Sequence, residues 1–574
     1  MPPRLLLIDA IGPFFRGYEK SRINWSKIPF HHLPVHGSER APFWARVRQD
    51  LSHFCREVSD LGYTAVTLDD LSHLASHPSH EPEITGKIAV FRQEFARIFD
   101  LIREAGLGVY LTSDILPLTP RLAAEFGGRR PALDDYYADL VRGVLDDFPQ
   151  LGGLILRVGE SDGNDVRDAI RTQLHLTTAR HTNRMLRKLV PIASERGKDL
   201  ILRTWTVGAY RLGDLIWHRR TLAQALEGID SPHFIVSMKY GESDFFRYLP
   251  LNRAFFRIPH PKIIEFQARR EYEGAGEYPA PIGTDCERFA RELRQAENLV
   301  GVSTWCQTGG WHRFRRLAFL PDAGDDTWIR INARLIAGIF REEKTTDEVM
   351  RDLYGPERAP AVIELLRNAE TVIRELLYVR DFASQKLFFR RVRIPPLLHL
   401  YWDCLFINHP VRKIMRHMVQ DPERSLREGE AALALFPRMI QLSREAALPV
   451  RDLEHWRDFC QIVCLARRYY FLPFDEEIVE ALKNAKTVYK RNWPKSERQR
   501  YRIKLSFQPF HLKRRTIGWV AGILLRKKRG YRLLDHVFTL NLLGLAYRAS
   551  KPRRKQDMPK FLRKSAMGID SLFK

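Results

Sequence analysis

The sequence predicts an α/β protein in which a (β/α)₈ TIM barrel is followed by an all-helical C-terminal region. Three observations support this prediction. Eight short runs rich in aliphatic and β-branched residues occur before residue 310, amphipathic stretches of helical periodicity separate most of them, and strand-like runs become scarce from about Asp325 onward. We therefore divide the chain into a barrel at 1–325, a helical domain at 326–500 and a basic tail at 501–574.

The eight predicted strands share one design, an apolar run that ends in polar or charged residues. They cover residues 4–11, 64–70, 108–114, 151–160, 199–205, 233–240, 262–272 and 299–305. In a TIM barrel the C-terminal strand ends and their loops form the open mouth, so these charges are predicted to converge there. The alternative for any single charge is a solvated loop residue with no role in a site.

The helical domain and the tail differ in charge. Segments such as "APAVIELLRNAETVIRELLYVRDF" show helical periodicity, whereas the tail holds 19 Lys and Arg against three Asp, out of a net charge of +24 for the whole chain. Short apolar stretches between basic clusters, such as "TIGWVAGILL", are too short to span a bilayer and suit a helix on an anionic membrane surface. The alternative is a helix for subunit docking or core capping. The sequence allows a homodimer, and it contains no motif that indicates nucleic-acid binding.

The remaining composition indicates a globular protein of a reducing compartment. Apolar residues make up 44% of the chain, and its beginning lacks the long apolar stretch and cleavage site of a signal peptide. The six cysteines are scattered, and Cys460 and Cys464 have no nearby histidine with which to bind a metal. We predict a cytoplasmic location, with contact to the inner membrane if the tail binds lipid. No metal and no cofactor are indicated, because metal-ligand, nucleotide-loop and nucleophile-elbow motifs are missing from the sequence.

Several runs resemble, in order, the α-glucuronidases of glycoside hydrolase family 67. The similarity extends from about Asp9 to about Tyr354. The matching phrases are "IDAIGPFFRGYEKSRINW", "YTAVTLDDLSHLA", "IFDLIREAGLGVYLTSDI", "DDFPQLGGLILRVGESDGND", "KDLILRTWTVG", "HFIVSMKYGESDFF", "IIEFQARREYEGAG" and "LVGVSTWCQTGGWHRFRRLAFLPD". The resemblance implies a distant relative with a TIM barrel and an exo-acting glycosidase activity toward an α-linked uronic acid.

Glycoside hydrolysis requires one carboxyl group that delivers a proton and one that activates water or attacks. The resemblance implies that Asp244 is the base, that Glu271 helps it to hold the water, and that the reaction inverts configuration. The proton donor is either Glu160 or Asp162, because the family's Ser-Glu-Gly phrase meets "ESDG" in this sequence. Inverting carboxyl groups stand about 6.5–9.5 Å apart, against about 5–5.5 Å in retaining enzymes.

A uronic acid carries a carboxylate, which arginine and lysine recognise. The resemblance assigns this contact to basic residues of the fourth, fifth and sixth strands, here Arg157, Arg203 and Lys239. The alternative is that each cation balances nearby barrel carboxylates. Glu265 is predicted to share the face of Glu271 by strand alternation and is interpreted as a buried acid paired with a barrel arginine, while it also remains a candidate sugar contact.

Aromatic rings and hydroxyl-binding groups complete the predicted sugar site, because pyranose C–H faces stack on rings. Ordinary packing is the alternative for each aromatic residue. The aromatic candidates are Trp205, Tyr240, Trp305 and Trp311, and the candidates for hydrogen bonds to sugar hydroxyls are Tyr18, Asp69 and Asp70.

The predicted partner is an oligosaccharide or polysaccharide, with an anionic sugar as the leading hypothesis. A second hypothesis is a glycosidase of different sugar specificity that acts on a cell-envelope or exopolysaccharide glycan. A third is a non-catalytic carbohydrate-binding barrel, which the shifted acid phrase favours.

Overall fold

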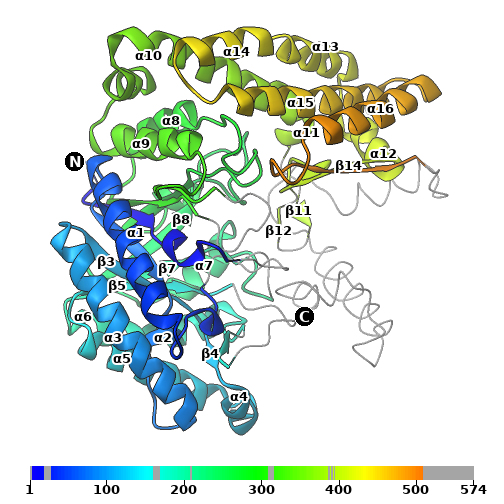
Figure 1. Ribbon diagram of the computed structural model, residues 1–574. Helices are drawn as coiled ribbons and strands as arrows, with labels where there is room; N and C mark the ends of the chain where they lie inside the picture. The colour runs from blue at the N-terminus through cyan, green and yellow to red at the C-terminus, as the bar shows by residue number, and fades with distance from the viewer. Residues whose placement is uncertain are drawn as a thin grey trace.

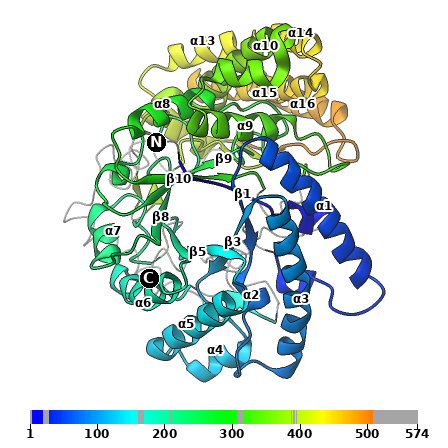
Figure 2. The same cartoon turned by 90° about the vertical axis from the view of Figure 1, so that its left-hand side faces the viewer.

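The structure is a computed structural model that describes residues 3–18, 28–159, 169–172, 174–206, 210–307, 316–385, 388–389, 392–393 and 395–507. Eight parallel strands form a closed barrel, and Figure 2 shows them around its centre. In chain order the strands are β1 (Leu5–Asp9), β2 (Ala65–Asp69), β3 (Gly108–Asp114), β5 (Leu151–Arg157), β7 (Asp199–Arg203), β8 (Phe234–Lys239), β9 (Lys262–Gln267) and β10 (Leu299–Trp305). The predicted TIM barrel is confirmed.

The strands alternate between two apolar environments, as the period of two in a strand requires. Leu6 and Ile8 of β1 belong to the main core beneath the helices. Leu5 and Leu7 of the same strand instead join a separate cluster inside the barrel. The other members of that inner cluster are Ala65, Tyr110, Ile155, Ile201, Ile235 and Ile263. The barrel is therefore filled by side chains at the N-terminal half of its strands.

Helices cover the outside of the barrel (Figure 2). They are α1 (Arg40–Asp60), α2 (Leu71–Leu74), α3 (Pro82–Glu104), α4 (Pro120–Phe126), α5 (Arg130–Asp147), α6 (Ala179–Ser194), α7 (Arg219–Leu226), α8 (Gly283–Leu293) and α9 (Thr327–Arg341). Between β8 and β9 the described segment 240–261 forms only a 3₁₀ turn, η3 (Arg253–Phe256). Helix α9 follows the predicted domain boundary at residue 325, yet it packs on the barrel, since Phe340 contacts Phe266 of β9 with ring centroids 5.2 Å apart.

One strand is shorter than predicted, and this changes an inference about Glu271. The seventh run was expected to remain extended to residue 272, but β9 ends at Gln267. Glu271 lies in the loop that follows, where the backbone of Arg270 has a positive φ of 52°. The argument that alternation places Glu265 and Glu271 on one face is therefore wrong, because Glu271 is not part of the strand.

The C-terminal part is a stack of helices beside the barrel (Figure 1). It contains α10 (Thr346–Val372), the π-helical turn η4 (Ile373–Leu377), α11 (Arg380–Ala383), α12 (His409–Met418), α13 (Pro422–Leu433), α14 (Phe436–Glu445), α15 (Val450–Phe471) and α16 (Glu476–Asn492). Helix α15 packs against α12, α13, α14 and α16, which explains why most of its side chains are buried.

A small sheet joins this helical part. Strands β13 (Leu400–Tyr401) and β14 (Cys404–Asn408) form a hairpin, and β15 (Arg502–Ser506) pairs with β14 in parallel. Strand β15 belongs to the segment predicted as a basic tail, and the rest of that tail, residues 508–574, lies outside the described residues. All six cysteines are buried free thiols. In the described part of the chain no helix has the length and apolarity required to cross a bilayer.

Candidate active site

Every second side chain of a barrel strand faces inward. Along each strand these inward-facing side chains change from apolar to polar toward the C-terminal end. In β7, for example, Ile201 belongs to the inner cluster and Arg203 follows two residues later. The inward-facing residues that end the eight strands are Asp9, Asp69, Asp114, Arg157, Arg203, Lys239, Gln267 and Trp305. The strand ends therefore surround one mouth with acids, cations and an indole, at the end where TIM barrels place their active sites.

Arg157 forms ion pairs with the acids of β2 and β3. Its Nε lies 2.6 Å from Oδ1 of Asp114, and its Nη2 lies 3.6 Å from Asp69 and 3.9 Å from Asp70. Asp70 also begins α2, because its carboxylate accepts the backbone N–H of Ser72 at 2.7 Å. One fully buried guanidinium therefore pairs with three buried carboxyl groups, which agrees with the alternative considered for this cation.

Arg203 forms the second cluster of the mouth, with residues of β8, β9 and β10. Its Nε donates to Oε2 of Glu265 at 2.9 Å, and its guanidinium lies 4.2 Å from the ring centroid of Trp305. Glu265 also accepts the hydroxyl of Ser237 at 2.7 Å and the indole N–H of Trp305 at 3.3 Å. Glu265 is thus a buried acid paired with a barrel arginine, and it orients both Arg203 and Trp305.

Lys239 ends β8 between aromatic rings and a carboxylate. Its Nζ lies 3.5 Å from the ring centroid of Trp205 and 4.3 Å from that of Phe245, and it also forms an ion pair with Asp244. Aromatic faces attract such a cation. Trp205 is half-buried, so part of its ring remains accessible beside the charged group.

Asp244 and Glu271 both influence the hydroxyls of Tyr272 and Tyr401. The Tyr272 hydroxyl donates to Oδ2 of Asp244 at 2.7 Å, while the backbone N–H of Phe245 donates to its Oδ1 at 3.0 Å. Burial raises the pKa of Tyr272 well above its ordinary value, and the charges of Asp244 and Glu271 raise it further. Burial and the same two acids also raise the pKa of Tyr401. Asp244 and Glu271 are 27 positions apart in the sequence, and both raise the pKa of the same two tyrosine hydroxyls.

Two aromatic residues of this site were missed by the sequence analysis. Tyr401 and Trp402 lie at the tip of the β13–β14 hairpin, and their ring centroids are 5.7 and 6.1 Å from that of Tyr272. Trp402 has a positive φ of 49°, which is unusual for a bulky residue and typical of tight turns and functional positions. The tetrapeptide "YWDC" has no feature that relates it to the barrel mouth, so packing of the helical domain is what places these rings there.

Asp9 is a further buried acid of the mouth. Its carboxylate accepts the backbone N–H groups of Cys306 and Gln307, which begin the loop after β10. Burial raises its pKa to about 7, although these hydrogen bonds act in the opposite direction. Asp9 therefore binds the loop after β10 to the end of β1.

Some predicted site residues lie elsewhere. The Tyr240 ring packs against Phe266 and Phe289 in the layer between barrel and helices, with centroids 5.6 and 5.1 Å apart. Tyr18 lies in the loop after β1 and packs against Phe15 and His32. The two candidate proton donors, Glu160 and Asp162, and the aromatic candidate Trp311 lie outside the described residues.

One group among the described residues has metal-ligand geometry, and it lies outside the mouth. Nε2 of His175 and Nε2 of His181 lie 2.8 and 3.1 Å from Oδ1 of Asp134, which projects from α5. Arg184 forms an ion pair with the other oxygen of Asp134 at 2.7 Å. Both carboxylate oxygens therefore already have nitrogen partners, so the cluster is complete as a structural contact between α5 and α6.

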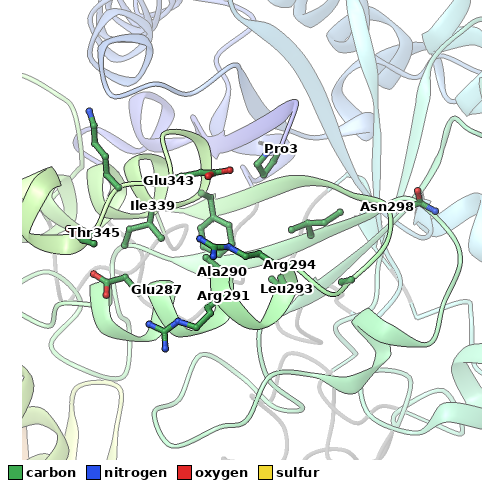
Figure 3. Close-up of a pocket in the computed structure, with 14 residues that line it drawn as sticks. Pro3, Glu287, Ala290, Arg291, Leu293, Arg294, Asn298, Ile339, Glu343 and Thr345 are labelled. Carbon is green, nitrogen blue, oxygen red and sulfur yellow. The ribbon is translucent and has the colours of Figure 1, made fainter. Parts of the chain in front are cut away.

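A cavity of about 530 Å³ lies at the opposite end of the barrel (Figure 3). Pro3 lines it just before β1, and Leu299 lines it at the start of β10. Arg291, Arg294 and Glu343 surround it from the ends of α8 and α9. In TIM barrels the N-terminal strand ends contribute to stability, whereas chemistry occurs at the other end.

No protein-family model matches the sequence, and a search of the curated proteins finds no match. A search of solved structures finds a GH138 enzyme targeting pectin rhamnogalacturonan II, with a TM-score of 0.51, 11% identity, and coverage of 85% of this chain and 76% of that chain. It also finds a family 89 glycoside hydrolase from Clostridium perfringens, with a TM-score of 0.38, 9% identity, and coverage of 85% and 53%. At 11% identity the likeness to the GH138 enzyme concerns the fold alone, which in this chain is a TIM barrel followed by a helical domain.

Proposed function

We propose that the protein is an exo-acting, inverting glycoside hydrolase that removes an α-linked uronic acid, or a related acidic sugar, from an oligosaccharide or polysaccharide. The observation that carries this proposal is the hydrogen bond at the barrel mouth between Asp244 and Tyr272, the residue that directly follows Glu271. These two carboxyl groups, from the ends of neighbouring strands, would supply the water-activating side of glycoside hydrolysis, which also requires a proton donor. A glycoside hydrolase fold with a TM-score of 0.51 adds support.

In the proposed reaction Asp244 takes a proton from the attacking water. Its Oδ1 already accepts hydrogen bonds from Lys239 and Phe245, whereas its Oδ2 accepts only that of Tyr272 among the described residues and has a second lone pair with which to accept the water. Glu271 orients the same water, and either Glu160 or Asp162 protonates the leaving oxygen. The contribution of such general acid and base groups is typically about 10²–10⁴-fold each in rate.

The sugar carboxylate is proposed to bind at the cations of the mouth. Arg203 and Lys239 are adjacent around the barrel, because β7 pairs with β8. Each lies against an indole, Trp305 for Arg203 and Trp205 for Lys239, so one ring can contact a sugar face while the cation binds its carboxylate. The structural neighbour described as targeting pectin rhamnogalacturonan II is compatible with an acidic glycan as substrate.

A second candidate function is supported by the ion pairs. Arg157 is balanced by Asp69, Asp70 and Asp114, and Arg203 is balanced by Glu265. Cations that are already neutralised leave less positive charge for a sugar carboxylate. This favours a glycosidase with a different sugar specificity, which would act on a cell-envelope or exopolysaccharide glycan.

The test is hydrolysis by the purified full-length protein of matched α-linked glucuronides, galacturonides and neutral glycosides. We expect release of a free uronic acid, loss of about 10²–10⁴-fold in kcat for Asp244→Asn, and a β-anomer as first product by NMR. Release of neutral sugars alone would support the second candidate. Binding of uronosyl ligands without turnover would instead indicate a non-catalytic barrel, and inactivity without binding would contradict all three.

A further inference from the structure

The loop after β9, residues 268–278, contains four acidic or basic residues besides Glu271, and all of them are buried. They are Arg269, Arg270, Glu273 and Glu277. Of the charged residues of this loop, the proposed function uses only Glu271. Glu273 and Glu277 lie on the C-terminal side of Glu271, and each pairs with arginine in a cluster that includes the helical domain.

The first cluster surrounds Glu273, whose side chain is fully buried. Arg247 donates to both of its oxygens at 3.0–3.2 Å, and Arg270 donates to them at 2.6 and 3.0 Å. Tyr378, which directly follows η4 of the helical domain, donates its hydroxyl to Oε1 of Glu273 at 2.7 Å. Burial by itself would raise the pKa of Glu273, but the two guanidiniums lower it to about 2, so Glu273 is ionised at neutral pH.

This first cluster determines the backbone next to Glu271. Arg270, the residue before Glu271, has left-handed backbone conformation with a φ of 52°. Its carbonyl accepts the backbone N–H groups of Glu273 and Ala275 at 2.9 and 3.0 Å, and its side chain pairs with Glu273. A bulky residue remains in this conformation only where its surroundings stabilise it. The pair of Arg270 and Glu273 supplies that stabilisation, and Tyr378 orients Glu273.

Tyr378 is itself fixed by the core of the helical domain. Arg467 of α15, which is 2% exposed, donates to the carbonyl of Leu376 at 2.9 Å and to the carbonyl of Tyr378. The Tyr378 hydroxyl also accepts the backbone N–H of Arg247 at 3.1 Å. A continuous set of hydrogen bonds therefore extends from α15 through Tyr378 to Glu273.

The second cluster acts at the other end of the loop. Glu277 lies 3.5 Å from Arg316 and 3.1 Å from Arg498, and both arginines pair with Asp452 of α15 at 2.7–2.8 Å. Trp328 of α9 donates its indole N–H to Asp452 at 2.7 Å. Glu273, near the middle of the loop, and Glu277, near its end, are thus both bound to the helical domain through buried charges.

We propose that the helical domain holds the Glu271 loop in its working position through these two clusters, and that Tyr378 and Asp452 are positioning residues. The catalytic consequence rests on the proposed function, because it assigns Glu271 to the reaction. The structural part, immobilisation of residues 268–278, does not depend on it. The barrel mouth is accordingly complete only with the helical domain packed against it.

The experiment compares Tyr378→Phe and Asp452→Asn with a control, Glu364→Gln, in the full-length protein. Glu364 of α10 forms an exposed ion pair with Arg438 of α14, so its loss changes the charge of the helical domain without reaching the loop. We expect amide hydrogen exchange of peptides covering 268–278 to rise at least fivefold in the first two variants and to be unchanged in the control. We also expect kcat to fall about tenfold with KM within twofold of the wild type.

The possible outcomes separate the two proposals. Faster exchange in both variants, with a wild type inactive on every glycoside, would retain the positioning role and contradict the proposed function. Unchanged exchange and unchanged kcat in both variants would overturn the positioning role. An equal rise of exchange over the whole helical domain with KM and kcat changed together would also overturn it, because that result indicates general loosening of the fold.

Discussion

The hydroxyl of Tyr272 donates a 2.7 Å hydrogen bond to Oδ2 of Asp244, joining the loop after β9 to the loop after β8. The Tyr272 ring packs against Phe246 with centroids 4.5 Å apart and stacks on Trp402 of the helical domain at 6.1 Å. The proposed base is therefore oriented by a residue whose ring packs against an aromatic residue of the barrel and one of the helical domain. This contact connects the two acids of the proposed reaction.

Replacement of Tyr272 by phenylalanine should lower kcat. The variant retains the ring contacts and loses the hydrogen bond to a carboxylate, which is worth about 1.5–3 kcal/mol, or about 10–100-fold in rate. Steady-state kinetics on the substrate identified for the wild type measure the change. Tyr110→Phe is the control, because its hydroxyl donates to Asp199 at the opposite end of the barrel at 2.8 Å. Equal kcat values for Tyr272→Phe and the wild type would contradict this role.

Replacement of Trp402 by alanine should raise KM. Its ring is partly exposed and lies 3.9 Å from that of Tyr401, so it offers an aromatic face at the mouth. Loss of one aromatic contact worth about 0.5–1.5 kcal/mol predicts a KM increase of about two- to tenfold. Trp402→Phe keeps a ring and should retain a KM close to that of the wild type. If alanine and phenylalanine behave alike, Trp402 is a packing residue only.

The pair of Arg203 and Glu265 should show strong coupling in stability. Arg203→Met leaves Glu265, which is 1% exposed, without its cation, and breaking such a pair costs about 3–5 kcal/mol. The double variant Arg203→Met with Glu265→Met removes both charges and should be less destabilised than the sum of the single variants. Urea unfolding measures all three. Additive effects would show that the pair is not coupled.

Stability should depend on pH through Asp9. Burial raises its pKa from 3.8 to about 7, so between these values the native protein holds a proton that the unfolded chain has released. Stability from this group is complete below about pH 3 and is lost as the pH rises from about 4 to 7, by about 4 kcal/mol in total. The stability of Asp9→Asn relative to the wild type should therefore increase between pH 4.5 and pH 8, as urea midpoints would show. The exposed Asp60→Asn is the control, and a constant difference at both pH values would contradict the prediction.

The sequence by itself determined the barrel and the composition of its mouth. Strand alternation is local, so counting by twos from Ile201 to Arg203, or from Ile263 to Glu265 and Gln267, is enough to predict which side chains face inward. The same rule does not extend into loops. It gave the wrong geometry for Glu271, because the left-handed backbone of Arg270 ends any alternation before that residue.

Only the tertiary structure decided which of the clustered acids are candidates for chemistry. Glu271, Glu273 and Glu277 are similar in sequence, but Glu273 and Glu277 pair with arginines and bind the helical domain. Tyr401 and Trp402 reach the mouth from more than 120 residues away, because packing of the helical domain positions their hairpin. Pairing of buried charges and contact between domains depend on residues distant in the chain, whereas the inward face of a strand depends on its neighbours alone.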